Sequence, residues 1–121
     1  MKFITLLFSL VFFAVGDTAE IVSWDSTEYN FGEIQQNIPA TATYELTNNS
    51  DVPLLIENVK VGCGCTTSNY SKEPILPGET TIIEATYNAQ KMGKFTKTAA
   101  VQTNLSDEAT ILSFTGEVIN A

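Results

Sequence analysis

Two cysteines separated by a single glycine are the residues of this chain best suited to chemistry. Cys63, Gly64 and Cys65 lie within the run Val61–Thr67, and the 121-residue sequence contains no other cysteine. In an extended strand, residues two apart point to the same face, with α-carbons near the outer limit for a disulfide. Gly64 allows the backbone to bend and bring the two sulfurs together. In an exported protein, the pair could therefore form a local disulfide.

The cysteine pair is compatible with a structural, a redox or a metal-binding role. A disulfide that closes a loop of about three residues contributes only about 1.6 kcal/mol, against about 3 kcal/mol for about fifteen residues. Such a small ring is a poor staple for a whole domain, and strained disulfides are the more easily reduced ones. A reactive thiol needs a nearby cation, and the nearest in sequence are Lys60 and Lys72.

For metal binding, two thiolates at this spacing could hold a soft ion such as Cu(I). Zn(II) would need two more ligands, which would have to be carboxylates such as Glu57 or Glu73 because the chain has no histidine. Met92 is the remaining soft ligand outside the amino-terminal segment. The candidate site is therefore Cys63, Gly64 and Cys65, with no assigned metal or cofactor.

The charged residues exclude several classes of function. The formal net charge is −8 at pH 7, the six basic residues are all lysines, and histidine is absent. An acidic surface without arginine repels nucleic acids and anionic membranes. Without histidine, catalytic triads and ordinary general-base sites lose their usual member. We therefore expect a protein that is not an enzyme and does not bind nucleic acid.

The first 16 residues have the pattern of a secretory signal peptide. Lys2 precedes an apolar run from Phe3 to Val15, and Gly16 offers a small-residue exit. The run is shorter than the roughly 20 residues that span a bilayer, which favours cleavage over a retained anchor. We predict a signal peptide over 1–16, a single domain over 17–121, a periplasmic or secreted location, and no stable membrane insertion after cleavage.

The remaining residues alternate apolar and polar side chains, which is the period of β-strands. No helical pattern interrupts them. This spacing predicts an all-β, immunoglobulin-like antiparallel β-sandwich of about seven strands. The expected strands cover residues 21–24, 29–34, 40–48, 53–61, 80–87, 95–103 and 109–119, with a loop from Ser68 to Glu79.

Several positions carry more specific expectations. A bulge near Glu57 and Asn58 would reconcile a change of phase in strand 53–61, and Pro77-Gly78 suits a type II turn. Lys97 marks a place where its strand lies at a sheet edge, and Gly116 marks a bulge or close approach. The cysteines are expected at the end of a central strand.

The aromatic residues Trp24, Tyr29 and Phe31 are assigned to the core. A role in stacking on a ligand is the alternative, and plain packing is the favoured reading for aromatic residues in a small sandwich.

Motifs spread over nearly all of residues 17–121 resemble the DUF1573 family. The most specific is Cys63-Gly64-Cys65-Thr66 followed by Pro77-Gly78, and the one departure is Gly62, where serine or a similar small residue is expected. The resemblance implies an exported domain, common in Bacteroidetes and related bacteria, with an immunoglobulin-like fold similar to pilus chaperones and ciliary ASH/Hydin proteins. It implies no known activity. The other motifs are Phe31–Ile34, Leu46–Ser50, Pro53–Ile56, Val59–Val61, Leu76–Glu79, Gly93–Phe95, Thr103-Asn104 and Thr115-Gly116.

Taken together, these features favour an exported, non-catalytic module that binds a protein or a glycan at the cell envelope. The alternative is a thiol redox or Cu(I)-binding protein that uses Cys63 and Cys65.

Overall fold

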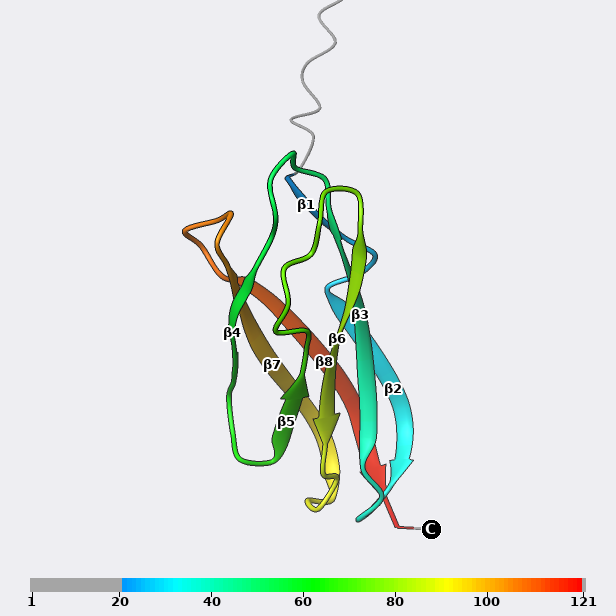
Figure 1. The fold of residues 1–121 in the computed structure, drawn as a ribbon. Coiled ribbons are helices and arrows are strands. Elements are labelled where there is room, and N and C mark those ends of the chain that lie inside the picture. Colours follow the sequence, from blue (N-terminus) through cyan, green and yellow to red (C-terminus); the bar gives the residue numbers. More distant parts are fainter. Residues whose placement is uncertain (1–20, 121) are drawn as a thin grey trace, which may run out of the picture.

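The computed structural model describes residues 21–120, which form two four-stranded β-sheets packed face to face (Figure 1). This range contains strands and no helix, and so no helix in it is long and apolar enough to cross a membrane. The all-β sandwich expected from the sequence is confirmed. The predicted signal peptide, residues 1–16, and residues 17–20 lie outside the described part of the chain.

The first sheet is antiparallel, with the strand order β1-β3-β6-β5. This order matches the four-stranded sheet of a constant-type immunoglobulin domain. The prediction for β3 is correct to the residue, and its inward side chains Ala42, Tyr44 and Leu46 are at most 1% exposed. The strands are β1 (Val22–Trp24), β3 (Ala40–Asn48), β6 (Thr80–Tyr87) and β5 (Thr66–Asn69).

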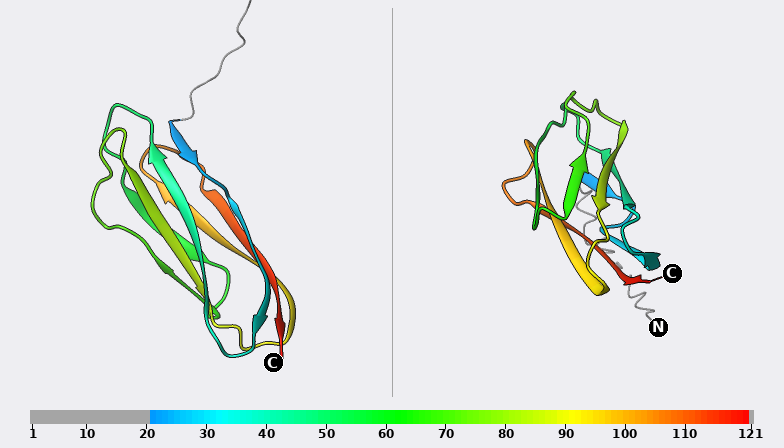
Figure 2. Two further views of the ribbon diagram at one scale, coloured as in Figure 1. Left: turned by 90° about the vertical axis from the view of Figure 1, so that its right-hand side faces the viewer. Right: turned by 90° about the horizontal axis from the view of Figure 1, so that it is seen from below.

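The second sheet has the order β2-β8-β7-β4 and contains one parallel pair. The chain passes from β1 to β2 without reversing direction, so β2 runs parallel to β8 (Figure 2). The expectation of a wholly antiparallel sandwich is wrong at this pair, because it assumed that successive strands reverse. The strands are β2 (Glu28–Gln35), β8 (Thr110–Ile119), β7 (Gly93–Thr103) and β4 (Ile56–Val61).

Strand β5 raises the number of strands from the expected seven to eight. It pairs with β6 from Thr66 opposite Tyr87 to Asn69 opposite Glu84. The prediction of a loop from Ser68 to Glu79 is therefore wrong at its start. This short edge strand consists of polar residues of which only Thr66 is buried, so it lacks the apolar alternation that signals a strand.

Two local expectations are confirmed by the backbone. The register between β4 and β7 shifts between Ile56 and Asn58, as a bulge requires. Gly78 has a φ of +83°, and the Glu79 N–H donates to the Leu76 carbonyl at 2.9 Å, which closes the predicted turn.

Lys97 and Gly116 also occupy the predicted environments. Strand β4 pairs with β7 only as far as Ala99, so at Lys97 strand β7 has β8 alone as a neighbour. A Cβ atom on Gly116 would lie 2.7 Å from the Phe95 ring and 2.9 Å from the Gly32 carbonyl oxygen. The absence of a side chain at Gly116 is what allows this close approach.

A buried amide organises the loops at the end of the sandwich where β3 finishes. The Asn48 side chain is fully buried, and its Nδ2 donates to the carbonyls of Val52 and Ile75 at 2.9 and 2.8 Å. Its Oδ1 accepts from the N–H and hydroxyl of Ser50 at 2.9 and 2.7 Å. Asn48 therefore connects the β3–β4 and β5–β6 loops.

The core lies between the sheets, and the three assigned aromatic residues differ in their burial. Trp24 and Phe31 are partly buried against the core, whereas Tyr29 is 37% exposed and contacts the rings of Phe31 and Tyr44. The buried apolar residues are Ala42, Tyr44, Leu46, Leu54, Ile56, Val59, Ile75, Ile83, Ala85, Tyr87, Ala89, Phe95, Ala99, Val101, Leu112, Phe114 and Val118.

Candidate functional site

The turn that contains the two cysteines connects the two sheets. It follows β4, which is the edge strand of the second sheet, and precedes β5, which is the edge strand of the first (Figure 1). The expectation that the cysteines end a central strand is wrong, because β4 pairs with β7 alone. Val59 and Val61 alternate with polar residues, as in a strand with one buried face. Edge strands and central strands can both show this pattern, so it does not distinguish them.

Cys63 and Cys65 form a disulfide, with α-carbons 5.3 Å apart. The Thr66 N–H donates to the Cys63 carbonyl at 3.3 Å, and the Asn88 N–H donates to the Cys65 carbonyl at 2.9 Å. Both cysteines are partly exposed, and Cys65 also packs against the core. The bonded pair leaves no free thiol in residues 21–120.

The groups that metal chemistry would need are not gathered at this turn. Nowhere in residues 21–120 do three or more cysteine, aspartate or glutamate side chains cluster in a way that could hold a metal ion, so Glu57 and Glu73 do not complete a site with the cysteines. The Lys72 ammonium lies 3.4 Å from the centroid of the Tyr70 ring and interacts with that ring. In the described residues, the turn therefore contains a closed disulfide and no assembled metal site.

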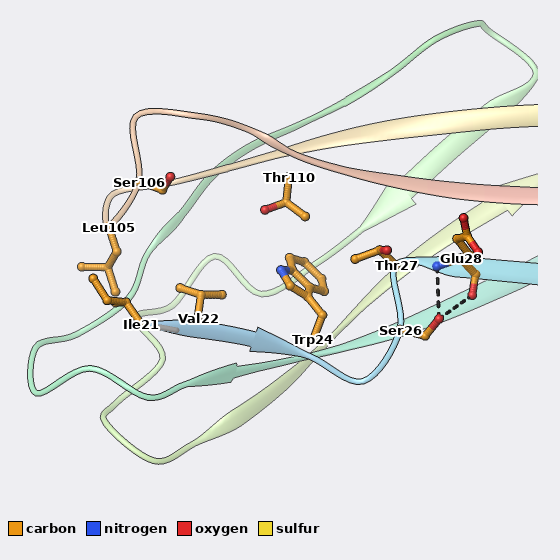
Figure 3. A pocket seen from close by; sticks show the side chains of 9 residues that line it. All are labelled: Ile21, Val22, Trp24, Ser26, Thr27, Glu28, Leu105, Ser106 and Thr110. Atoms are coloured by element: carbon orange, nitrogen blue, oxygen red, sulfur yellow. Dashed lines mark hydrogen bonds between the residues drawn. The ribbon is translucent and has the colours of Figure 1, made fainter. Parts of the chain in front are cut away.

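A solvent-open cleft of about 730 Å³ lies at the opposite end of the sandwich, and we call it the Trp24 cleft (Figure 3). Its volume lies in the range of small-ligand sites, roughly 300–1,000 Å³. One wall comes from β1 and the segment that leads into β2, and the other from the β7–β8 loop and the start of β8. The lining residues are Ile21, Val22, Trp24, Ser26, Thr27, Glu28, Leu105, Ser106 and Thr110.

The segment after Trp24 is fixed where the chain leaves the first sheet. The Asp25 carboxylate accepts from the backbone N–H groups of Glu45 and Ser26 at 2.8 and 2.7 Å. The Asp25 N–H donates to the Glu45 carbonyl at 3.1 Å, which extends the pairing of β1 with β3 by one bond. This bend ends β1 and turns the Trp24 indole into the cleft, between Val22 and Thr27 (Figure 3).

The two serines of the cleft hold its walls in shape. Ser26 Oγ donates to the Glu28 carbonyl and accepts from the Glu28 N–H, at 2.8 and 3.1 Å. Ser106 Oγ makes the same pair of bonds with Glu108, at 3.0 and 3.2 Å. Both hydroxyls are therefore committed to local turns and are poor candidates for binding a ligand.

Four polar groups in the cleft are free to bind a ligand. The Trp24 indole N–H, the Glu28 carboxylate and the hydroxyls of Thr27 and Thr110 form no hydrogen bond with any other group in residues 21–120. A hollow with an aromatic ring, apolar walls and a few unpaired polar groups is typical of a binding site.

Sequence reasoning placed Trp24 in the core and did not find this cleft. Its two walls come from residues 21–28 and 105–110, which are far apart in sequence. They become neighbours only because β2 pairs with β8, and that parallel pairing leaves no periodic signal in the sequence. The lone tryptophan beside a polar turn was the only clue, and buried packing accounted for it equally well.

Comparison with solved structures confirms the immunoglobulin-like fold. A protein of unknown function from Porphyromonas gingivalis W83 matches with a TM-score of 0.70 and 17% identity, over 80% of this chain and 46% of that one. The ASH/PapD-like domain 7 of human CEP192 matches with a TM-score of 0.65 and 10% identity, over 84% and 87% of the two chains. The YadV chaperone matches with a TM-score of 0.57 and 15% identity, over 81% and 52%.

At these identities the similarity concerns the fold alone, and this chain spans about half of the Porphyromonas protein and of YadV. Comparison with curated proteins finds no match. The family model described as "Protein of unknown function (DUF1573)" matches residues 22–118, and the chain belongs to that family.

Proposed function

We propose that this chain is an exported, non-catalytic module that binds another protein or a glycan at the cell envelope. The observation that carries the proposal is the Trp24 cleft, an open hollow with an aromatic ring and unpaired polar groups. The similarity to a chaperone and to a PapD-like domain adds an analogy of fold, which is a weak argument for function.

Two parts of the proposal, export and a non-catalytic role, are supported by the sequence of the chain. Residues 1–16 have the pattern of a signal peptide, and a disulfide persists in an oxidising compartment such as the periplasm or the extracellular space. The lack of histidine argues against general-base catalysis, and the lack of arginine with a net charge of −8 argues against nucleic-acid partners. No cofactor and no stable insertion into a membrane are part of the proposal.

Fractionation and cross-linking of the full chain in its own cells test this function. We expect a tagged chain in the periplasm or the medium, cross-linked to a reproducible partner. Ile82→Thr serves as a control and should recover the same partner as the wild type, because Ile82 is exposed on the outer face of the first sheet, away from the cleft. A cytoplasmic chain, or a folded chain that recovers no protein or glycan above background, would overturn the proposal.

The second candidate is a thiol redox or Cu(I)-binding role at the cysteine turn. What favours it is that Cys63 and Cys65 are both partly exposed, so that a reductant could reach them. Titration of the purified protein with a glutathione redox buffer measures how easily the disulfide is reduced. Addition of Cu(I) to the reduced form then measures whether the two thiols bind the metal. Thiols that react only after the domain is denatured would exclude it.

A further inference from the structure

We infer that the Trp24 cleft binds a lysine or arginine side chain that projects from the protein partner. This inference rests on the proposed binding function and specifies the chemistry of its ligand. Three features of the cleft point to a cation: the aromatic ring, the sign of its single charge, and its apolar walls.

The first feature is the indole itself. Tryptophan is the aromatic side chain that attracts a cation most strongly, because the face of its ring carries negative electrostatic potential. The Trp24 ring lies in the cleft opposite Thr110 (Figure 3). The chain already contains one interaction of this kind, since the Lys72 ammonium lies 3.4 Å from the centroid of the Tyr70 ring.

The second feature is charge. Among residues 21–120, Glu28 is the only ionisable residue that lines the cleft, and no lysine of this range lines it. The β7–β8 loop that supplies Ser106 continues with Asp107 and Glu108, both exposed. An anionic ligand would be repelled from this site, and a neutral sugar would not draw on the negative charge, whereas a cation benefits from both the carboxylate and the ring.

The third feature is the apolar wall. Ile21, Val22 and Leu105 line the cleft beside the indole. Lysine and arginine carry a hydrocarbon stem that packs along such a surface while the charged end reaches a polar group. The free hydroxyls of Thr27 and Thr110 can then bind the backbone on either side of that residue. A segment of a partner protein therefore fits the cleft better than an isolated ion.

The sequence provides its own reporter for the test, because Trp24 is the only tryptophan in the chain. Its fluorescence is followed while the full domain is titrated with the peptide acetyl-Gly-Gly-Arg-Gly-Gly-amide at constant ionic strength. The matched probe replaces arginine with citrulline, which keeps the planar shape and removes the charge. We expect a saturable change with the arginine peptide and affinity about fivefold weaker for the citrulline peptide.

Two variants separate the charge from the ring. Glu28→Gln should weaken the arginine peptide about threefold, whereas Glu57→Gln, an equal change of charge at an exposed residue of β4, should leave it unchanged. Trp24→Leu, with binding followed by NMR, should weaken it about fivefold. Since Glu28 is exposed, Glu28→Gln keeps the test valid even if the Trp24 variant unfolds.

Several outcomes would overturn the inference. Equal affinity for the arginine and citrulline peptides, or for Glu28→Gln and the wild type, would exclude recognition of a cation. Saturable binding of chitotriose without binding of the arginine peptide would assign the cleft to a glycan. An envelope partner that is captured equally by the wild type and Glu28→Gln would overturn this inference and leave the proposed function standing. Failure to capture any partner would overturn the proposed function and, with it, this inference.

Discussion

The two ends of this sandwich are connected in different ways. At one end a disulfide lies within the turn between β4 and β5, and it joins Cys63 to Cys65, two positions along the chain. At the other end Asn48 donates to Val52 and to Ile75, a residue 27 positions away. A disulfide stabilises mainly by restricting the unfolded chain, and a loop of about three residues restricts it little. The amide stabilises through four hydrogen bonds that only the folded chain makes. The covalent bond is therefore the more conspicuous connection, and the buried amide is the more important one for stability.

The largest effect is expected from Asn48→Ala. The substitution removes four hydrogen bonds of a buried amide, two to the carbonyls of Val52 and Ile75 and two from the N–H and hydroxyl of Ser50, and leaves a small void. We expect a loss of about 3–4 kcal/mol in the free energy of unfolding, measured by urea denaturation. Asn69→Ala, an exposed asparagine of β5, should change it by less than about 0.5 kcal/mol. A loss for Asn48→Ala below about 1 kcal/mol would contradict the conclusion that the buried amide contributes more to stability than the disulfide.

The next effect tests what stabilises the end with the cysteines. Near this end, the Phe95 ring packs over Gly116 and stacks with the Tyr87 ring, their centroids 4.3 Å apart. Gly116→Ala forces the Phe95 ring and the Gly32 carbonyl to move, and should cost about 2–3 kcal/mol by the same urea measurement. Gly64→Ala is the matched control in the cysteine turn, since its Cβ would meet nothing within 4 Å. Equal costs for the two alanines would contradict this account.

Removal of the disulfide should cost less than either of these. The double change Cys63→Ser and Cys65→Ser opens a loop of about three residues, so the loss is at most about 1.6 kcal/mol. Reduction of the wild-type protein should lower stability by a similar amount and leave the circular dichroism spectrum of the folded sheets intact. A loss above about 3 kcal/mol would show that the covalent bond, and not the aromatic packing, holds this end.

The smallest effect at neutral pH concerns a hydrogen bond between the two sheets. Tyr44 on β3 donates its hydroxyl to the Ser113 carbonyl on β8 at 2.7 Å, so Tyr44→Phe should cost about 1 kcal/mol. Burial, with a smaller contribution from Tyr29, raises the pKa of Tyr44 to about 12. The contribution of Tyr44 is therefore complete below pH 10 and is lost as the pH rises from about 10 to about 12.

The measurement is the pH dependence of the difference in unfolding free energy between the wild type and Tyr44→Phe. Unfolding free energies of the wild type and Tyr44→Phe are compared across pH 9 to 12, and the difference between them is followed. The advantage of the wild type should shrink as the pH rises above 10. A difference in unfolding free energy that stays constant across this range would mean that Tyr44 ionises equally in the folded and unfolded chains.

Much of the fold could be predicted because one face of most strands is buried. The alternation in Ala40–Asn48 reproduces β3 in full, and Gly78 and Gly116 are positions where the backbone tolerates little else. Strand β5 could not be found, because a short edge strand needs no apolar period. Asn48 was assigned to a polar turn, since burial of an amide depends on carbonyls that only the folded chain brings near.

The candidate site, too, could be predicted from the sequence only in part. The spacing of Cys63 and Cys65 correctly made a local disulfide available, but the neighbouring sequence could not show that the turn lies between two sheet edges. The Trp24 cleft depends on two segments that meet through the pairing of β2 with β8. Contacts between distant segments follow from topology, which local sequence patterns do not specify.

The parallel pairing of β2 with β8 has a mechanical consequence. The amino-terminal part of the described chain begins at the cleft end, and β8 finishes at the opposite end (Figure 1). A force that pulled the two ends of the domain apart would slide β2 along β8, from the pair Glu28–Ser113 to the pair Gln35–Ile119. All the hydrogen bonds of that pair would then bear the load together, instead of opening one after another. The β2–β8 pair would therefore resist tension along the length of the domain in shear.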